Sequence, residues 1–532
     1  MNAQLIRLNL RFNRMTIIWW CLGLWAFLAV TPPAYLQYYP TLEERAPLVE
    51  GMRETLGTKA MYGLFPPPGT IGQFTTWETG ALLCILSSTM AVLIFTSMHR
   101  GAEARGEAEL IQSMGLPRST IHHAALLSSI LVATLTGLGS TLILITLHYV
   151  STDEISLAGS VAFGLMITVT MIGFIGVTSI LQSLFGHATN LLRLGLVSIA
   201  VAFLLRMFAD TYDSNFSSAF NWISPLGWRT HILPFTDDDW TALGVAALIT
   251  GGLLIAAVIL NSSREVNASL VPQRVQKGRA PRTIRGLISL NLLTHRGAII
   301  AWSLTCGVII ASILPLVDSM IPLLEQDEAT LNILQDLLPL ENLQSEFIIY
   351  IFQMVAVLVS VAVVQPLVFY MSQERSRLVD TVRATGTRRS TPLAGAVTTA
   401  LLTGLTCAIL SIIGGLIALQ IQGGEMVDGM ELVFASALSM IPQTLVFVGL
   451  ATVCAGWLPR FIHLSWLPVV LAGVVSILGP LLTLTPEQVD LSPLSHTITP
   501  SGDGLGALAL FSALGLVGII LGIIGSERRE IP

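Results

Sequence analysis

Long apolar runs recur along the whole chain, and short polar segments separate them. Each run reaches about 20 residues, the length that an α-helix needs to cross the hydrocarbon core of a bilayer. Lipid offers the backbone no hydrogen-bond partners, so such runs must be helical, and the short alternating segments of a membrane β-barrel do not occur. The pattern therefore predicts an all-α polytopic membrane protein with twelve transmembrane helices. The predicted spans are 15–36, 79–98, 121–149, 156–185, 190–209, 240–261, 298–321, 347–371, 392–420, 431–457, 464–484 and 504–525.

The basic residues lie mostly on one side of this predicted topology. If the N-terminus is cytoplasmic, the cytoplasmic segments hold most of the 27 lysines and arginines. The outer segments hold only Arg45, Arg53, Lys59 and Arg229, and the outer loop 318–346 is acidic. Because cytoplasmic loops of membrane proteins carry an excess of basic residues, both termini are predicted to be cytoplasmic.

Composition agrees with a membrane protein and excludes a soluble globule. Hydrophobic residues make up 53% of the 532 residues and charged residues 11%, whereas a soluble domain carries about 25% charge. The five cysteines all lie inside apolar runs and are interpreted as small core residues. An amphipathic stretch, residues 5–14, leads into the first span without a cleavage site, so no signal peptide is expected.

Three short motifs occur twice, in the same order in each half of the chain. The pairs are Leu8-Asn9-Leu10 with Leu290-Asn291-Leu292, Gly115-x-x-Arg118 with Gly386-x-x-Arg389, and Ser224-Pro225-Leu226 with Ser492-Pro493-Leu494. Each half has six predicted spans and begins in the cytoplasm, so the repeat is predicted to be parallel, with a pathway between the halves. The predicted boundaries are 1–262 for the first six-helix half, 263–296 for a cytoplasmic linker with an amphipathic helix, and 297–532 for the second half.

The cytoplasmic loops after the second and eighth spans carry the most distinctive polar pattern. Each predicts a short amphipathic helix that ends at a glycine, Gly115 or Gly386, before a basic turn begins the next span. The charges predicted on the outward face are Glu103, Glu107, Glu109 and Arg118 in the first loop, and Glu374, Asp380, Arg383 and Arg389 in the second. A helix lying along the membrane surface shows the same pattern, so the loops alone leave both interpretations open.

Catalytic and nucleotide-binding motifs are missing from the sequence. No Gly-x-x-x-x-Gly-Lys-Ser/Thr phosphate loop occurs, and neither Lys59 nor Lys277 sits in such a frame. No Ser/His/Asp arrangement or nucleophile elbow is found, and the nine histidines show no metal-ligand spacing. The chain is therefore expected to have no catalytic residue, no metal site and no cofactor of its own.

Four residues in or near the spans are candidates for a transport pathway. Arg206 lies near the outer end of the fifth span, and Asp210 follows one turn later at i+4. The pair is either a snorkelling arginine anchored by its neighbour or a polar gate. Trp19 and Trp25 belong to an aromatic cluster in the first span, which an aromatic belt or stacking on a substrate would explain.

Three features give the chain a family resemblance over nearly its whole length. They are the N-terminal amphipathic segment with Arg11, Arg14 and Trp19-Trp20, the acidic loop ending Gly115-x-x-Arg118, and the string Trp222-Ile223-Ser224-Pro225-Leu226-Gly227-Trp228 with Pro234 and Trp240 outside the fifth span. The string is the most specific of the three, and its copy around Ser492-Pro493-Leu494 is degenerate. In these features the chain resembles ABC transporter permeases of the type 2 exporter superfamily, in the tetronasin or polyketide-antibiotic exporter branch.

The resemblance implies a function and partners. It implies a permease in the cell membrane that exports hydrophobic drug-like, antibiotic or lipid-like molecules. ATP hydrolysis would belong to two copies of a separate ABC ATPase subunit, which would hold the ATP and magnesium. The loops 100–119 and 373–390 would be coupling helices docked on these subunits. No nucleic acid partner is implied.

Two other classes remain as alternatives. An ion-coupled secondary transporter often has twelve spans, but it should show intramembrane carboxylates, and the predicted span interiors hold almost none. The loop after the second span also lacks the Gly-x-x-x-Asp-Arg/Lys-x-Gly-Arg-Arg pattern of the major facilitators. A membrane-embedded lipid-modifying enzyme should gather acid/base or metal ligands at one face, which this sequence does not.

Overall fold

The computed structural model describes residues 3–54, 56–104, 113, 115, 117, 119–185, 188–212, 219–263, 284, 286–324, 343–421, 427–478, 484–498 and 504–529. Within these residues every regular element is a helix, and twelve helices are long and apolar enough to cross a membrane, judged by length and composition. The prediction of an all-helical chain with twelve spans is therefore confirmed. The spans are Arg14–Tyr38, Ile71–His99, Ser119–Val150, Leu157–Leu184, Leu192–Asp210, Trp240–Ser262, Leu287–Pro315, Ser345–Arg375, Thr391–Gln420, Gly429–Trp457, Pro459–Ile477 and Leu505–Arg528.

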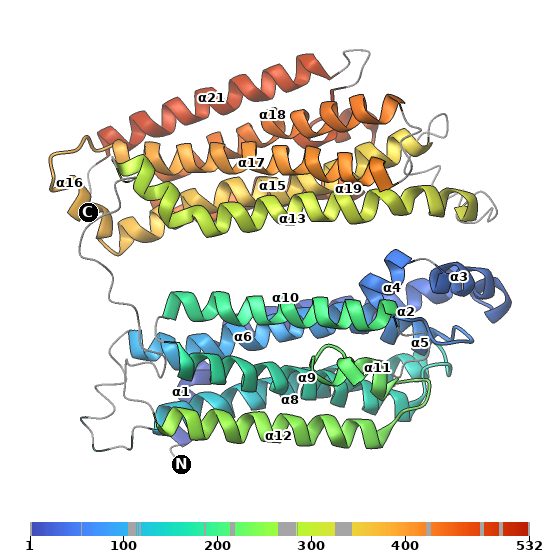
Figure 1. Ribbon diagram of the computed structural model, residues 1–532. Helices are drawn as coiled ribbons and strands as arrows, with labels where there is room; N and C mark the ends of the chain where they lie inside the picture. Colours follow the sequence, from blue (N-terminus) through green and yellow to red (C-terminus); the bar gives the residue numbers. More distant parts are fainter. Residues whose placement is uncertain are drawn as a thin grey trace. The chain divides into compact units, whose positions relative to one another are not determined.

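The helices form two units, Met1–Gln276 and Lys277–Pro532, each drawn as its own bundle in Figure 1. Unit 1 contains α1 (Ala3–Phe12), α2 (Arg14–Tyr38), α3 (Leu42–Glu54), α4 (Leu56–Tyr62), α5 (Ile71–Phe74), η1 (Thr75–Thr79), α6 (Gly80–Ala104), α8 (Ser119–Val150), α9 (Leu157–Leu184), α10 (Ala188–Tyr212), η2 (Ala219–Trp222), α11 (Arg229–Ile232) and α12 (Trp240–Ser262). Unit 2 contains α13 (Leu287–Leu324), α15 (Leu343–Arg375), α16 (Leu378–Arg383), α17 (Thr391–Ile421), α18 (Val427–Trp457), η4 (Pro459–Ser465), α19 (Trp466–Leu478), α20 (Pro486–Val489), η5 (Pro493–Ser495) and α21 (Leu505–Arg528).

Equivalent spans pack against each other in the two units. The first span of each unit packs on the third, as α2 on α8 and α13 on α17. The fourth span packs on the second, third and sixth, as α9 does on α6, α8 and α12, and as α18 does on α15, α17 and α21. The two units therefore share one order of helix packing, which is the arrangement that a duplicated chain predicts.

Each unit has its own hydrophobic core. Phe95, Phe163 and Trp228 are buried in unit 1, and Phe352 and Met371 are buried in unit 2. Leucine and isoleucine side chains also remain exposed along the outer faces of the spans. Such exposure is costly in water but not in lipid, where tails are as apolar as the side chains.

The two largest differences from the predicted span boundaries are at the starts of the second and seventh spans. The second span begins at Ile71 rather than residue 79, because Thr70 and Gln73 form a capping box that starts the helix early, and a π-helical turn, Thr75–Thr79, leads into α6. The seventh span begins at Leu287, inside the segment predicted to be a linker. The amphipathic helix and the seventh span are thus one continuous helix.

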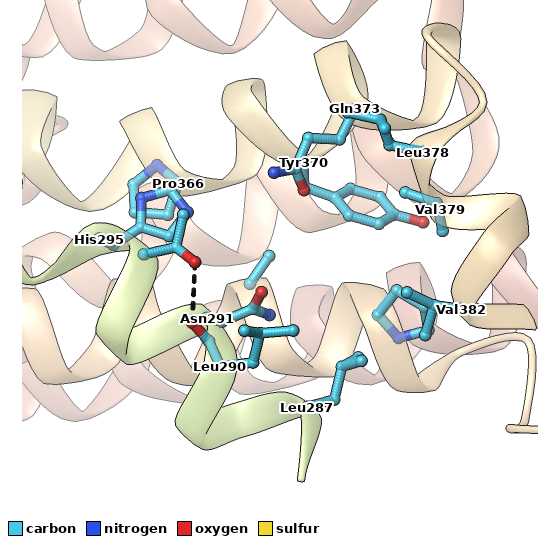
Figure 2. A pocket seen from close by; sticks show the side chains of 13 residues that line it. Leu287, Leu290, Asn291, His295, Pro366, Tyr370, Gln373, Leu378, Val379 and Val382 are labelled. Atoms are coloured by element: carbon cyan, nitrogen blue, oxygen red, sulfur yellow. Dashed lines mark hydrogen bonds between the residues drawn. The ribbon is translucent and has the colours of Figure 1, made fainter. Parts of the chain in front are cut away.

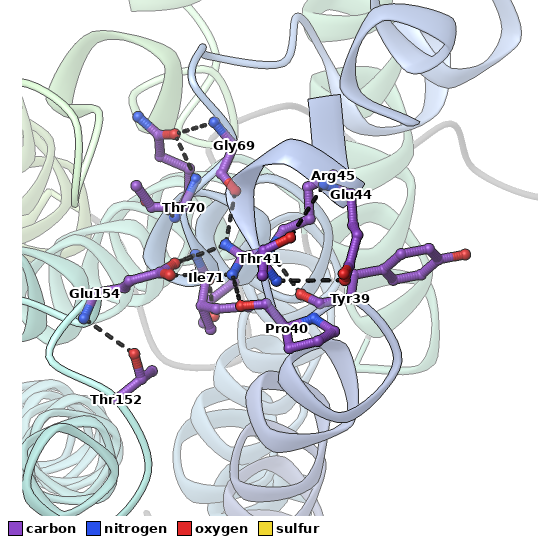
Figure 3. Close-up of polar contacts among 12 residues, drawn as sticks. Tyr39, Pro40, Thr41, Glu44, Arg45, Gly69, Thr70, Ile71, Thr152 and Glu154 are labelled. Atoms are coloured by element: carbon purple, nitrogen blue, oxygen red, sulfur yellow. Dashed lines mark hydrogen bonds and ion pairs between the residues drawn. The ribbon is translucent and has the colours of Figure 1, made fainter. Parts of the chain in front are cut away.

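Figure 1 shows α3, α4 and α5 together at one end of unit 1, opposite α1. We call this part the outer head, because the sequence predicts that it lies outside the cell. Arg45 is fully buried in this head. Its guanidinium lies 2.6 Å from Glu154 and also donates to the carbonyl oxygens of Tyr39, Pro40 and Gly69, as Figure 3 shows. The ion pair joins α3 to the loop between the third and fourth spans.

Candidate functional site

The loop after the eighth span contains the short helix expected there. α15 ends at Arg375, Arg377 adopts a left-handed conformation, and α16 covers Leu378–Arg383. Val379 is buried, and it fixes one face of α16 against the bundle. Gly386 then takes a φ of +82°, which favours glycine, and α17 begins at Thr391. Figure 1 places α16 at the same end of unit 2 as the C-terminus.

Glu374 connects three helices at this end of unit 2. Its Oε1 lies 2.7 Å from Nη2 of Arg383 on α16, and its Oε2 lies 2.5 Å from Nη2 of Arg529, just after α21. Arg529 also donates to the carbonyl of Ala455 in α18, at 2.9 Å. The side chain of Glu374 is 8% exposed. The carboxylate therefore ties α16 to the ends of α15 and α21.

This geometry corrects one part of the sequence interpretation. Glu374 and Arg383 were expected to face outward from the loop, but both side chains are buried by their mutual ion pair and by Arg529. Each oxygen of this carboxylate accepts a charge-assisted hydrogen bond from a guanidinium, and these bonds offset part of the cost of taking the charges out of water. Asp380 and Arg389 do face outward, and the Asp380 side chain is 43% exposed.

The first loop is described in part. Gly115 has a φ of +81°, nearly the value at Gly386, and Glu103 lies in the last turn of α6. The expectations for Glu107, Glu109 and Arg118, and for the side chain of Glu103, fall outside the described residues. Gly115 and Gly386 thus end the two loops in the same conformation.

A pocket of about 170 Å³ lies beside α16. Figure 2 shows Leu287, Leu290 and Asn291 of α13 on one side and Tyr370 of α15 with Val379 of α16 on another. The pocket also borders the start of α17 through Pro392 and Ala396. The described residues that line it include His295 but no aspartate, glutamate, lysine or arginine. Because it separates the beginning of α13 from α16, the pocket gives these two helices room to approach each other.

Arg206 and Asp210 meet as predicted at the outer end of α10. Nη1 of Arg206 lies 3.7 Å from Oδ2 of Asp210, and the two side chains are 3% and 4% exposed. Arg206 also donates to the carbonyl of Met61 in α4, at 2.6 Å, and lies over the ring of Phe203. The guanidinium therefore faces protein and not acyl chains.

Arg229 is a member of this cluster that sequence reasoning missed. It is buried, and it donates to the carbonyls of Tyr62 and Thr76. Burial lowers the pKa of Arg229, while the carboxylate of Asp210 opposes that change. Asp210 also accepts from Asn221 at 2.7 Å. Two buried guanidiniums thus share one carboxylate, and the only sequence signal was that Arg229 directly follows the string 222–228.

The tryptophans of the first span have different surroundings. Trp25 donates to the carbonyl of Thr136 at 3.2 Å and lies against Gly139, so it fastens α2 to α8. Trp19 is 68% exposed on α2. A role of either residue in binding substrate stays a prediction.

Comparison with known proteins places these features in context. The family model described as the multidrug efflux system permease Rv1217c, C-terminal domain, matches residues 3–260 and 284–526. The two matched segments correspond to the two six-span halves. The multidrug efflux system permease protein Rv1217c of Mycobacterium tuberculosis (strain ATCC 25618 / H37Rv) is 25% identical over 538 residues, which covers 99% of this chain and 94% of the relative.

Proposed function

Because this chain belongs to the family of the multidrug efflux system permease Rv1217c, we propose that it is the membrane-spanning permease of an ATP-driven ABC exporter. The observation that carries the proposal is the family match over both six-span halves. The proposed substrates are hydrophobic drug-like, antibiotic or lipid-like molecules. On the motifs described above, we also propose that the chain belongs to the type 2 exporter superfamily of ABC permeases, in the tetronasin or polyketide-antibiotic exporter branch.

The partners in this proposal are two copies of an ABC ATPase subunit. These subunits bind ATP and magnesium, since the chain itself has no phosphate loop. α16 and the corresponding first loop dock on them. α16 suits this role because it is short, joined directly to α15 and α17, and held to the bundle through Glu374. Movement of the ATPase subunits is then passed to the spans.

The decisive experiment combines assembly with hydrolysis. The chain is expressed with a candidate ABC ATPase, ideally one encoded by a neighbouring gene, purified through a tag on the chain, and reconstituted in liposomes. The ATPase should co-purify, and a hydrophobic substrate should stimulate ATP hydrolysis. The isolated chain should neither bind nor hydrolyse ATP. Nucleotide binding by the isolated chain, or the failure of any cassette ATPase to associate, would contradict the proposal.

The proposed topology places both termini in the cytoplasm. Single cysteines at positions 275 and 340 test it with a membrane-impermeant thiol reagent on intact cells. Position 340 should react from outside, and position 275 should react only after the membrane is opened. Reaction of position 275 from outside would overturn the assignment.

A further inference from the structure

Among the acidic residues within the described spans, Glu78 lies furthest from an end of its own span. The other acidic residues in these spans all lie within a few residues of a span end; they are Asp210, Glu346, Glu374, Glu431 and Glu527. Glu78 lies about 10 Å along the helix axis from Ile71, where its span begins. An ionisable residue inside a span is costly, and it therefore points to a function.

The local backbone and one neighbour hold Glu78 in a defined position. Glu78 belongs to the π-helical turn Thr75–Thr79, and such turns occur frequently at functional sites. The hydroxyl of Tyr35, from α2, donates a hydrogen bond to Oε2 of Glu78. Glu78 nevertheless remains partly exposed, so the hydrogen bond from Tyr35 leaves part of the side chain accessible.

Tyr35 belongs to an aromatic cluster beside this carboxylate. Tyr35 and Tyr62 are partly exposed, and they pack on the buried rings of Phe74 and Trp77 with centroids 4.7 Å and 4.9 Å apart. Burial and the negative charge of Glu78 raise the pKa of Tyr62 to about 12. Tyr35 thus contacts Glu78 directly, Tyr62 lies near enough for the charge of Glu78 to act on it, and both tyrosines pack on a buried aromatic cluster.

The nearby arginines do not neutralise Glu78. Arg229 approaches this turn through the carbonyl of Thr76. Arg206 pairs with Asp210. Among the residues that the structure describes, no basic side chain forms an ion pair with Glu78.

We propose that Glu78, Tyr35 and Tyr62 bind the positive charge of an amphipathic organic cation, such as an ammonium or phosphonium compound with apolar substituents. The carboxylate supplies the opposite charge, and tyrosine faces attract cations, more strongly where water is excluded. The surrounding aromatic and aliphatic side chains suit the apolar substituents. The inference rests on the proposed export function and names one class of its substrates.

The test measures binding to the purified full chain without any ATPase. Tetraphenylphosphonium is the probe, and tetraphenylborate, which has the same shape and the opposite charge, is its control. Isothermal titration in lipid nanodiscs should show saturable binding of the cation and much weaker binding of the anion. Glu78→Gln should weaken cation binding at least tenfold, and Tyr35→Phe should weaken it several-fold. Glu431→Gln, which alters an exposed carboxylate near the beginning of α18, should leave cation binding unchanged.

Three results would overturn the site: no saturable cation binding, equal affinity for the two probes, or wild-type affinity in Glu78→Gln. If Glu78→Gln does not fold, Tyr35→Phe and Tyr62→Ala decide, and unchanged affinity in both contradicts the site. Failure of the site is distinct from failure of the proposed function. If the chain assembles with an ATPase but does not bind the cation, only the proposed cation site is wrong. If it binds the cation but no ATPase associates with it, only the proposed export mechanism is wrong.

Discussion

Gly115 and Gly386 adopt nearly the same backbone dihedral, with φ of +81° and +82°, at equivalent points of the loops after the second and eighth spans. In this left-handed region the Cβ of any other L-residue crowds the backbone. Among the described residues, apart from each glycine and its chain neighbours, no atom lies within 4 Å of the place where a Cβ would stand at Gly115 or Gly386. The requirement for glycine is thus set by the backbone and not by neighbouring side chains.

Replacing Gly386 by alanine should therefore destabilise the loop by about 1–2 kcal/mol, the cost of a left-handed alanine. Thermal unfolding of the purified chain measures the change, and stimulated ATP hydrolysis by the assembled transporter should fall with it. Gly252→Ala is the matched control, because this site in α12 is helical and equally open. At position 252 alanine should leave the unfolding temperature unchanged or raise it slightly. Equal effects at the two sites would contradict the backbone explanation.

The charges that α16 and the following turn expose should govern association with the ATPase. Reversing both, as Asp380→Lys with Arg389→Glu, should slow assembly severalfold. The unfolding temperature should change little, because Arg389 is exposed and the half-exposed pair of Asp380 with Arg383 is worth at most about 1 kcal/mol. Co-purification over a range of salt concentrations is the measurement. Glu487→Lys, at another exposed carboxylate of unit 2, should not affect it. Unaltered assembly in the double variant would remove these positions from the docking surface.

Glu374 should contribute mainly to the stability of unit 2. Glu374→Gln leaves two partly buried guanidiniums without their counter-charge and should cost roughly 2–4 kcal/mol. A double-mutant cycle with Arg529→Met should give a coupling energy of about 1–3 kcal/mol, because the two groups are 2.5 Å apart. Unfolding temperatures of the four proteins are compared. Additive effects would mean that the pair does not form in the membrane.

The outcome at Glu374 shows where sequence reasoning ends. The twelve spans could be predicted because length and apolarity act locally, and Arg206 with Asp210 because residues at i and i+4 share a helix face. The pairing of Glu374 with Arg529 joins positions 155 residues apart. No local pattern encodes such a contact, so a loop carboxylate is interpreted as solvent-facing until the packing of α21 is known.

Asp210 should matter more to stability than either of its arginine neighbours. Asp210→Asn leaves Arg206 and Arg229 buried without a carboxylate and should cost about 3–5 kcal/mol. Arg206→Met should cost less, since Asp210 keeps Arg229 nearby and Asn221 as a donor. Comparing the unfolding temperatures of Asp210→Asn and Arg206→Met shows which substitution costs more stability. A larger loss in Arg206→Met would show that the arginine's bond to Met61 dominates the cluster.

The ion pair of Arg45 and Glu154 should make the outer head sensitive to acid. Burial raises the pKa of Glu154, but hydrogen bonds from Arg45 and from the amide of Ile71 outweigh it and lower the pKa below its ordinary value. A lowered folded-state pKa contributes stability above the unfolded value, about 4.3, and the contribution is lost as pH falls through the folded value. Glu154→Gln should remove this pH dependence.

The measurement is the unfolding temperature of the wild type and Glu154→Gln from pH 7 down to pH 3. At pH 7 the variant should be less stable by about 1.5–3 kcal/mol, typical of a hydrogen bond to a charged group. The two curves should converge as the carboxyl becomes protonated. A constant difference across the range would mean that Glu154 does not titrate in the folded head.

The Arg45 and Glu78 contacts were not predictable for related reasons. Arg45 and Glu154 lie 109 positions apart, so no local pattern joins them. The count of basic residues on each side of the membrane uses Arg45 only to predict the orientation of the spans. No particular residue type or spacing in the sequence marks the π-helical turn at Thr75–Thr79. The predicted second span begins at residue 79, so Glu78 is assigned to the preceding loop. Carboxylates are common in such loops and do not by themselves indicate a function.

The continuity of α13 has a mechanical consequence. From Leu287 to Leu314 this helix contains no proline, the usual cause of a sharp kink, and it extends for about 42 Å. Its first turns border the pocket beside α16, and Asn291 lies against Gly395 of α17. α13 can therefore act as a stiff lever. A tilt of about 5° at its first turn would displace Leu314 by roughly 4 Å, so a small closure of the pocket at one membrane surface would become a larger movement near the other.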